Sequence, residues 1–153
     1  MTDAQLAALG AVCTRYPDVS LTFEGPPGGA VEAGDTSAVS VSLERDTDGL
    51  ALGPGGELPP VHAPRFPGRR DEGWWLVLGD PKANKLLAIK RVSLAAAAKV
   101  KLAFEAPAEV GAAKLTLFYM SDSWLGCDQE YEVEFRVTEA AAGGSGSDEE
   151  GSE

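Results

Sequence analysis

Short runs of strictly alternating apolar and polar residues, separated by breaks rich in glycine and proline, recur along this sequence. The clearest run is residues 130–137 (EYEVEFRV), where apolar and charged side chains alternate without exception. A period of two places every second side chain on the same face, as in a β-strand that is buried on one face. Alternating runs also cover residues 19–24, 39–44 and 99–104, and short, largely apolar runs that also indicate strands cover residues 74–78, 85–92 and 114–120. This pattern predicts an all-β chain of about seven strands.

Short strands with regular turn signals between them are typical of two sheets packed on one core. The sequence therefore predicts an immunoglobulin-like or fibronectin type III-like antiparallel β-sandwich. The strand of residues 74–78 is apolar on both faces, so we expect it to be central in its sheet. One of its tryptophans, Trp74 or Trp75, should lie in the core, and the long irregular loop of residues 46–70 should cover the other. The residues expected to point inward include Val39, Val41, Leu43, Val100, Leu102, Phe104, Val133 and Phe135.

The two ends of the chain differ from this strand pattern. Residues 3–15 have a partly helical apolar pattern, Asp3 is placed to cap it, and Pro17 prevents its continuation. We therefore expect a short helix over residues 1–16 and the β-sandwich over residues 17–139. Residues 140–153 contain glycine, serine and acidic residues with little apolar area to bury, which predicts a disordered acidic tail.

The net charge of −11 argues against a broad electrostatic surface for nucleic acid, which requires basic side chains. Cations do gather between residues 82 and 101, where they form either a solvated face or a docking patch. RNA contact is therefore expected to be weak or indirect. No apolar run reaches the ~20 residues that a membrane helix requires, so we expect no membrane contact.

The residue types needed for catalysis are poorly represented. His62 is the single histidine, and the glycine-rich segments lack the Lys-Ser/Thr pair of a phosphate-binding loop. Ala51 occupies the glycine position that a calcium loop starting at residue 46 would need. Asp122, Asp128 and Glu130 can either crowd a cation or shape a loop by hydrogen bonding, and we expect the second role. The sequence thus predicts no catalytic, cofactor-binding or metal-binding residues, and no enzyme.

Contacts with partner proteins are the remaining function; besides the adjacent pair Trp74 and Trp75, three segments offer candidate residues. The loop of residues 121–129 carries Trp124, which is either a core plug or a binding anchor. The proline-rich stretch around Phe66 is extended and suits contact at an edge. The cationic segment of residues 82–101 is the third. The candidate partner-binding residues are Arg65, Phe66, Lys90, Arg91, Trp124 and Leu125.

Several of these segments resemble one known family. The segments PRFPGRRDEGWWLVLGD (64–80), LLAIKRV (86–92), KVKLAFEAP (99–107) and LTLFYMSDSWLGCDQEYEVEFRV (115–137) are similar to the C-terminal immunoglobulin/fibronectin-like module, a SEC-type unit, of U5 small nuclear ribonucleoprotein (snRNP) spliceosomal RNA helicases. The second cassette fits better than the first. CTRYPDVSLTFE (13–24) resembles the helix and first strand that precede it, so residues 1–16 are expected to end a preceding helical domain. The string MSDSWLGCDQEY is the most specific match.

The resemblance implies a non-catalytic interaction module that supports pre-mRNA splicing in the nucleus. Its implied partners are other spliceosomal proteins and the remaining domains of the helicase. The helicase and ATPase domains of that family are absent from this chain, so we expect a fragment or a stand-alone module. Two related modules are alternatives, those of an ASC-1-complex helicase and of the J-protein of the endoplasmic-reticulum translocon. A stand-alone immunoglobulin-type adaptor is a further alternative.

Overall fold

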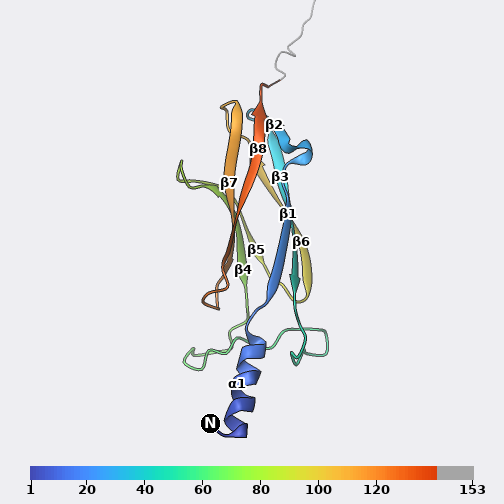
Figure 1. The fold of residues 1–153 in the computed structure, drawn as a ribbon, viewed down its shortest axis with the longest axis vertical. Coiled ribbons are helices and arrows are strands. Elements are labelled where there is room, and N and C mark those ends of the chain that lie inside the picture. The colour runs from blue at the N-terminus through green and yellow to red at the C-terminus, as the bar shows by residue number, and fades with distance from the viewer. Residues whose placement is uncertain (141–153) are drawn as a thin grey trace, which may run out of the picture.

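Two β-sheets lie face to face, and one helix extends from one end of them (Figure 1). The computed structural model describes residues 1–140. The acidic tail predicted for residues 140–153 therefore lies, beyond Ala140, outside the described residues. The end of the two sheets from which the helix extends is called the helix end below.

Helix α1 (Asp3–Arg15) begins with a capping box. The Gln5 N–H donates to Thr2 Oγ1 at 3.2 Å, and the Thr2 N–H donates to Gln5 Oε1 at 2.8 Å. Thr2, and not the predicted Asp3, is thus the N-cap, because its side chain satisfies an otherwise free N–H of the first turn. None of the side chains of α1 is buried.

The smaller sheet contains three strands in the order β1-β3-β6, all antiparallel. They are β1 (Val19–Glu24), β3 (Thr36–Arg45) and β6 (Ala97–Glu105).

The larger sheet contains five strands in the order β2-β8-β7-β4-β5. Its strands are β2 (Ala30–Glu32), β4 (Trp74–Asp80), β5 (Lys85–Val92), β7 (Gly111–Ser121) and β8 (Gln129–Thr138). The short 3₁₀ helix η1 (Pro27–Gly29) precedes β2. The all-β prediction is confirmed, and β4 lies inside its sheet as predicted.

Two details differ from the predicted antiparallel arrangement of seven strands. The structure has one strand more, β2, which pairs with β8 in parallel. In this pairing Val31 lies opposite Val137, and both side chains are buried. The sequence around residues 25–34 predicts only a break between strands, because glycine and proline are frequent in it. A strand as short as β2 has too few apolar side chains to indicate otherwise.

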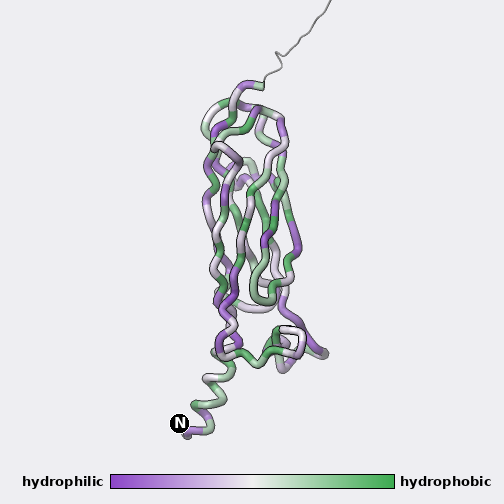
Figure 2. Tube along the Cα trace, turned by 90° about the vertical axis from the view of Figure 1, so that its right-hand side faces the viewer, coloured by the Kyte–Doolittle hydropathy of each residue, from purple (hydrophilic) through white to green (hydrophobic). Residues whose placement is uncertain are grey.

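The core lies between the sheets and draws side chains from both. Polar and apolar segments alternate along the strands (Figure 2), in agreement with the period of two in the sequence. The Phe104 and Phe135 rings pack across the core with centroids 5.6 Å apart. Every predicted core position is buried except Val100, which packs against the core while partly exposed.

The two adjacent tryptophans of β4 lie on opposite faces of the larger sheet. Trp74 is fully buried and stacks on Tyr119 with ring centroids 4.3 Å apart. Trp75 is 38% exposed, and the guanidinium of Arg91 lies 4.9 Å from its ring centroid. The prediction that the long loop covers the second tryptophan is wrong: Trp75 stays exposed beside Arg91, and the end of this loop is held instead by the ion pair of Arg70 with Asp122.

Candidate protein-interaction surface

One buried carboxylate, that of Glu72, holds the helix end together. Glu72 Oε1 accepts hydrogen bonds from Arg45 Nη1 and, at 2.9 Å, from Trp74 Nε1. Glu72 Oε2 accepts from Trp124 Nε1 at 3.1 Å. Arg45 Nη2 in turn donates to the carbonyl of Arg15, the last residue of α1, at 3.1 Å. The Glu72 and Arg45 side chains are only 5% and 2% exposed, so this pair is largely removed from water.

Tyr16, directly after α1, fixes the helix to the loop of residues 121–128. Its ring meets Trp124 edge-on, with centroids 5.5 Å apart, and its hydroxyl donates to the carbonyl of Leu125. A hydrogen bond with the Cys127 side chain, followed by burial, raises the pKa of Tyr16. Gly126 allows the turn because its φ of 79° lies in the left-handed region, which side chains disfavour.

Asp122 connects the same loop to the edge of the larger sheet. Its Oδ2 forms ion pairs with Arg91 and, at 3.1 Å, with Arg70. Its Oδ1 accepts from the Gly73 N–H at 3.1 Å and from the Ser123 hydroxyl. Burial raises the pKa of Asp122, but the hydrogen bonds from Ser123, Arg91 and Gly73 together outweigh it and hold this pKa below its usual value.

Most of the candidate partner-binding residues are linked through these contacts. The Arg70 guanidinium lies 5.8 Å from the ring centroid of Phe66, which is 50% exposed. Phe66 and Arg91 are therefore joined through Asp122 to the loop that carries Trp124. At the tip of this loop, the Leu125 side chain is 92% exposed. We call this set the end surface; it consists of Tyr16, Phe66, Arg70, Arg91, Trp124 and Leu125.

The other candidates do not join the end surface as closely. Lys90 points to the opposite face of β5 from Arg91, since neighbouring residues of a strand alternate. Arg65 is exposed. Lys99 and Lys101 lie on β6 in the smaller sheet, opposite serines of β3. The cationic segment of residues 82–101 is therefore divided among several surfaces and does not form one patch.

Trp124 is half-buried beside Glu72 and not in the core, and its role as a binding anchor stays a prediction. Its indole N–H is bonded to Glu72, while part of its surface stays accessible. Sequence reasoning missed the partner, Glu72, and its ion pair with Arg45. The alternation of Val39, Val41 and Leu43 continues in phase to Arg45, so a cation at a core position was visible and required a buried acid.

Two acidic side chains of the loop at residues 121–128, those of Asp122 and Asp128, bond to the protein itself. Asp128 Oδ1 accepts from the Ser121 N–H at 2.8 Å and shapes the loop, as expected. Within residues 1–140, no group of three or more histidine, cysteine or acidic side chains is placed to hold a metal ion. The one α-helix of this part of the chain is too short to cross a membrane.

The chain was then compared with known proteins. Residues 3–134 match the family described as the Sec63 Brl domain. The chain belongs to this family. The resemblance seen in the sequence is thereby confirmed for almost the whole folded part.

Several curated relatives of this Sec63 Brl domain chain are named as helicases. It is 44% identical over 140 residues to the U5 small nuclear ribonucleoprotein 200 kDa helicase of Homo sapiens, covering 92% of this chain and 6% of the helicase. It is 47% identical over 143 residues to the DExH-box ATP-dependent RNA helicase DExH12 of Arabidopsis thaliana, covering 94% and 6%. The activating signal cointegrator 1 complex subunit 3-like protein of Dictyostelium discoideum is 37% identical over 122 residues, covering 78% and 5%. The chain thus spans about 6% of the length of its U5 relatives.

Proposed function

We propose that this chain is the non-catalytic protein-interaction module at the C-terminus of a spliceosomal DExD/H-box RNA helicase, and that it supports pre-mRNA splicing in the nucleus. The observation that carries the proposal is the 44% identity to the human U5 helicase over 92% of this chain. The helix end adds physical support. Its buried acid holds two loops and a helix in fixed positions, which is what a preorganised binding surface requires.

The domain organisation is part of the same proposal. We assign residues 17–139 to one immunoglobulin-like or fibronectin type III-like β-sandwich, and residues 1–16 to the end of a preceding helical domain. Leu6 and Leu9 of α1 are 53% and 51% exposed, so the helix presents apolar side chains without a partner inside residues 1–140. Such a helix gains stability by packing against a neighbouring helix.

The end surface is the proposed contact with the remaining domains of the helicase and with other spliceosomal proteins. Leu125 supplies an exposed apolar side chain on a loop that Tyr16 and Trp124 hold in place. Phe66 and Arg91 add an aromatic ring and a cation, the residue types that dominate protein interfaces. Arg65 is exposed and next to Phe66 in the sequence, so it stays a candidate contact beside the end surface, whereas Lys90 would meet a different surface. RNA contact is proposed to be weak or indirect because the cations are dispersed and the net charge is −11.

The second candidate is the equivalent module of an ASC-1-complex helicase. The Dictyostelium relative supports it at 37% identity, below the 44% of the human U5 helicase. We therefore favour the spliceosomal role.

A chimeric helicase tests the proposal. This chain would replace the matching segment of the human U5 helicase, and pre-mRNA splicing would be measured in extract depleted of the native helicase. We expect the chimera to splice, and Leu125→Asp to weaken its association with the spliceosome. Val110→Asp is the matched control, since Val110 is also exposed, at 57%, but lies far from the end surface. A chimera that folds and purifies normally but does not splice would refute the proposal.

A further inference from the structure

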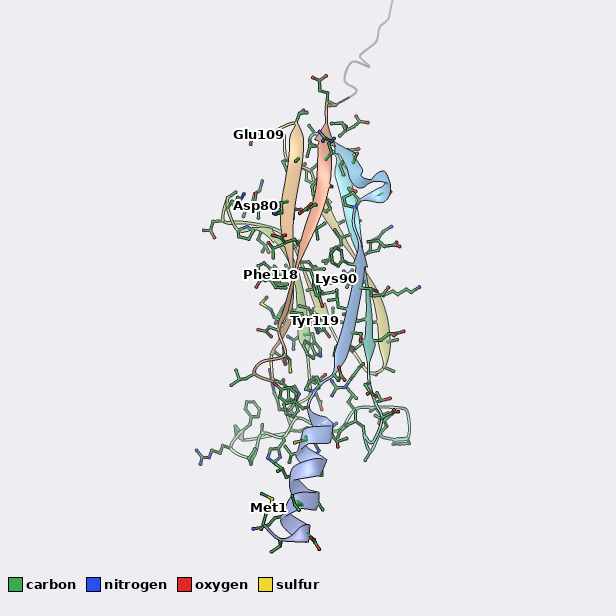
Figure 3. The ribbon with its side chains drawn as sticks, in the orientation of Figure 1. Met1, Asp80, Lys90, Glu109, Phe118 and Tyr119 are labelled. Carbon is green, nitrogen blue, oxygen red and sulfur yellow. The ribbon has the colours of Figure 1, made fainter. Side chains whose placement is uncertain are left out.

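A second surface, separate from most of the end surface, lies on the outer face of the five-stranded sheet. Strand β4 carries Trp75 and Val77, whose side chains point away from the core. Val77 lies between Ile89 of β5 and Phe118 of β7. Phe118 and Tyr119, both marked in Figure 3, are neighbours on β7 that point to opposite faces of this sheet, and only Tyr119 is fully buried.

These side chains form a continuous apolar patch. We call it the outer-sheet patch; it consists of Trp75, Val77, Leu86, Ile89 and Phe118. Ile89 and Leu86 are 54% and 58% exposed, and a shallow hollow lies beside Gly79, which has no side chain to fill it. A contiguous exposed apolar patch of this kind marks a site of interaction on a soluble protein.

A row of acids borders the patch on one side. Glu130 and Glu132 of β8 lie opposite Phe118 and Thr116 of β7, on the same outer face, and Glu134 continues the row. Lys114 Nζ lies 3.4 Å from Glu132 and 3.9 Å from Glu134. Among the described residues Glu130, which is nearest to the apolar patch, has no ion pair. The carboxylate of Glu130 is therefore available to pair with a partner that covers the patch.

The dimensions of the patch favour an α-helix as the partner. The patch spans three adjacent strands, β7, β4 and β5. The axes of the two outer strands, β7 and β5, are about 10 Å apart, which is about the diameter of one helix. An extended strand would cover only one row of side chains, and its backbone would find no sheet edge to pair with on this face. A second copy of this chain would bring together two molecules of charge −11 and their glutamate rows.

We propose that the outer-sheet patch binds a short amphipathic α-helix of a partner protein. The apolar stripe of that helix covers Trp75, Ile89 and Phe118, and basic residues along one flank pair with Glu130 and the glutamate row. The inference rests on the proposed function, because it specifies the chemistry of one partner of an interaction module, but it uses a different surface.

The test uses the full chain and a synthetic peptide of about 14 residues, close to four helical turns. The peptide carries a leucine stripe, lysines on one flank and glutamines elsewhere. A control peptide has glutamates in place of the lysines. Backbone amide chemical shifts are followed during titration. We expect saturable shifts in β4, β5, β7 and β8 with the lysine peptide, and binding that weakens as salt is raised.

Single substitutions at exposed positions separate the apolar and charged contributions. Ile89→Asp and Glu130→Lys are each expected to weaken binding of the lysine peptide roughly tenfold or more, because they place a charge on the apolar contact or reverse the attraction. Val110→Asp, at the far end of the sheets near Glu109 in Figure 3, should leave binding unchanged. Each variant is first shown to give the wild-type far-UV circular dichroism spectrum.

Three results would overturn the inference. The first is that the glutamate peptide binds as tightly as the lysine peptide. The second is that the chemical-shift changes map to α1 or the end surface. The third is that Ile89→Asp abolishes self-association of the chain, measured by sedimentation, instead of peptide binding. The chimeric helicase separates this failure from that of the proposed function. If the peptide does not bind but the chimera splices, only the proposed helical partner of the outer-sheet patch is refuted. If the chimera cannot splice, the proposed spliceosomal role is refuted.

Discussion

Replacing Glu72 with glutamine should destabilise the folded chain by about 3 kcal/mol. The substitution keeps the shape of the side chain but removes its charge, leaving the Arg45 guanidinium, 2% exposed, without a counter-charge. Breaking a buried ion pair from one side costs about 3–5 kcal/mol. We choose the lower bound because glutamine still accepts a hydrogen bond from one of the two indoles and Arg45 keeps the carbonyl of Arg15.

Urea unfolding followed by far-UV circular dichroism measures this loss. With a slope of about 1–3 kcal/mol per molar urea, the midpoint should fall by at least about 1 M. Glu134→Gln is the matched control, because Glu134 is 67% exposed and should change the free energy of unfolding by less than about 0.5 kcal/mol. Adding Arg45→Met to Glu72→Gln should restore part of the lost stability, since no unpaired cation is then buried. A loss below about 1 kcal/mol, or a double variant no better than the single one, would refute the buried-pair reasoning.

Three further outcomes are expected. Leu102→Ala should cost about 2–5 kcal/mol in the free energy of unfolding, measured with urea, because Leu102 is 2% exposed and a cavity would remain. Because the pKa of Asp122 is lowered in the folded chain, its stabilising effect is present above the unfolded pKa of about 4 and is lost as the pH falls below it, so Asp122→Asn should flatten the acid limb of the stability–pH curve. The purified chain should show no ATP hydrolysis above a buffer blank, and any RNA binding, measured by fluorescence anisotropy, should fall steeply with salt.

The strands could be predicted from the sequence because each carries its own evidence. The alternation around Val39, Leu102 and Val133 is local, and burial on one face is the only arrangement that satisfies it. Strand β2 could not be found in this way, because three residues are too few to show a period. Its pairing with β8 depends on a partner about 100 residues away. The exposure of Trp75 was missed for a similar reason, since a local pattern does not show which distant segment lies over the outer face of β4.

Several residues of the candidate site could be predicted from the sequence, but their arrangement in space could not. Phe66, Trp124 and Leu125 were identified because aromatic and apolar residues in loops require an explanation. Nothing local indicates that Asp122 joins Arg70 to Arg91, because these three residues come from a loop, a turn and a strand that only the fold brings together. Arg45 does carry a local signal, since its place in the alternation of β3 indicates a buried counter-ion, but nothing local identifies that counter-ion as Glu72.

Because β2 pairs with β8 in parallel, the first and last strands of the folded part differ in their resistance to a pulling force. Strand β8 is held between β7 and β2, so tension applied at Thr138 along the strand must shear two ladders of hydrogen bonds at once. Strand β1 has one ladder, to β3, and besides it the Gln129 side chain donates to the Val19 carbonyl, so the same force applied at Val19 acts on one ladder and one further hydrogen bond. Under a pull between these two points, β1 should detach first while the larger sheet stays whole.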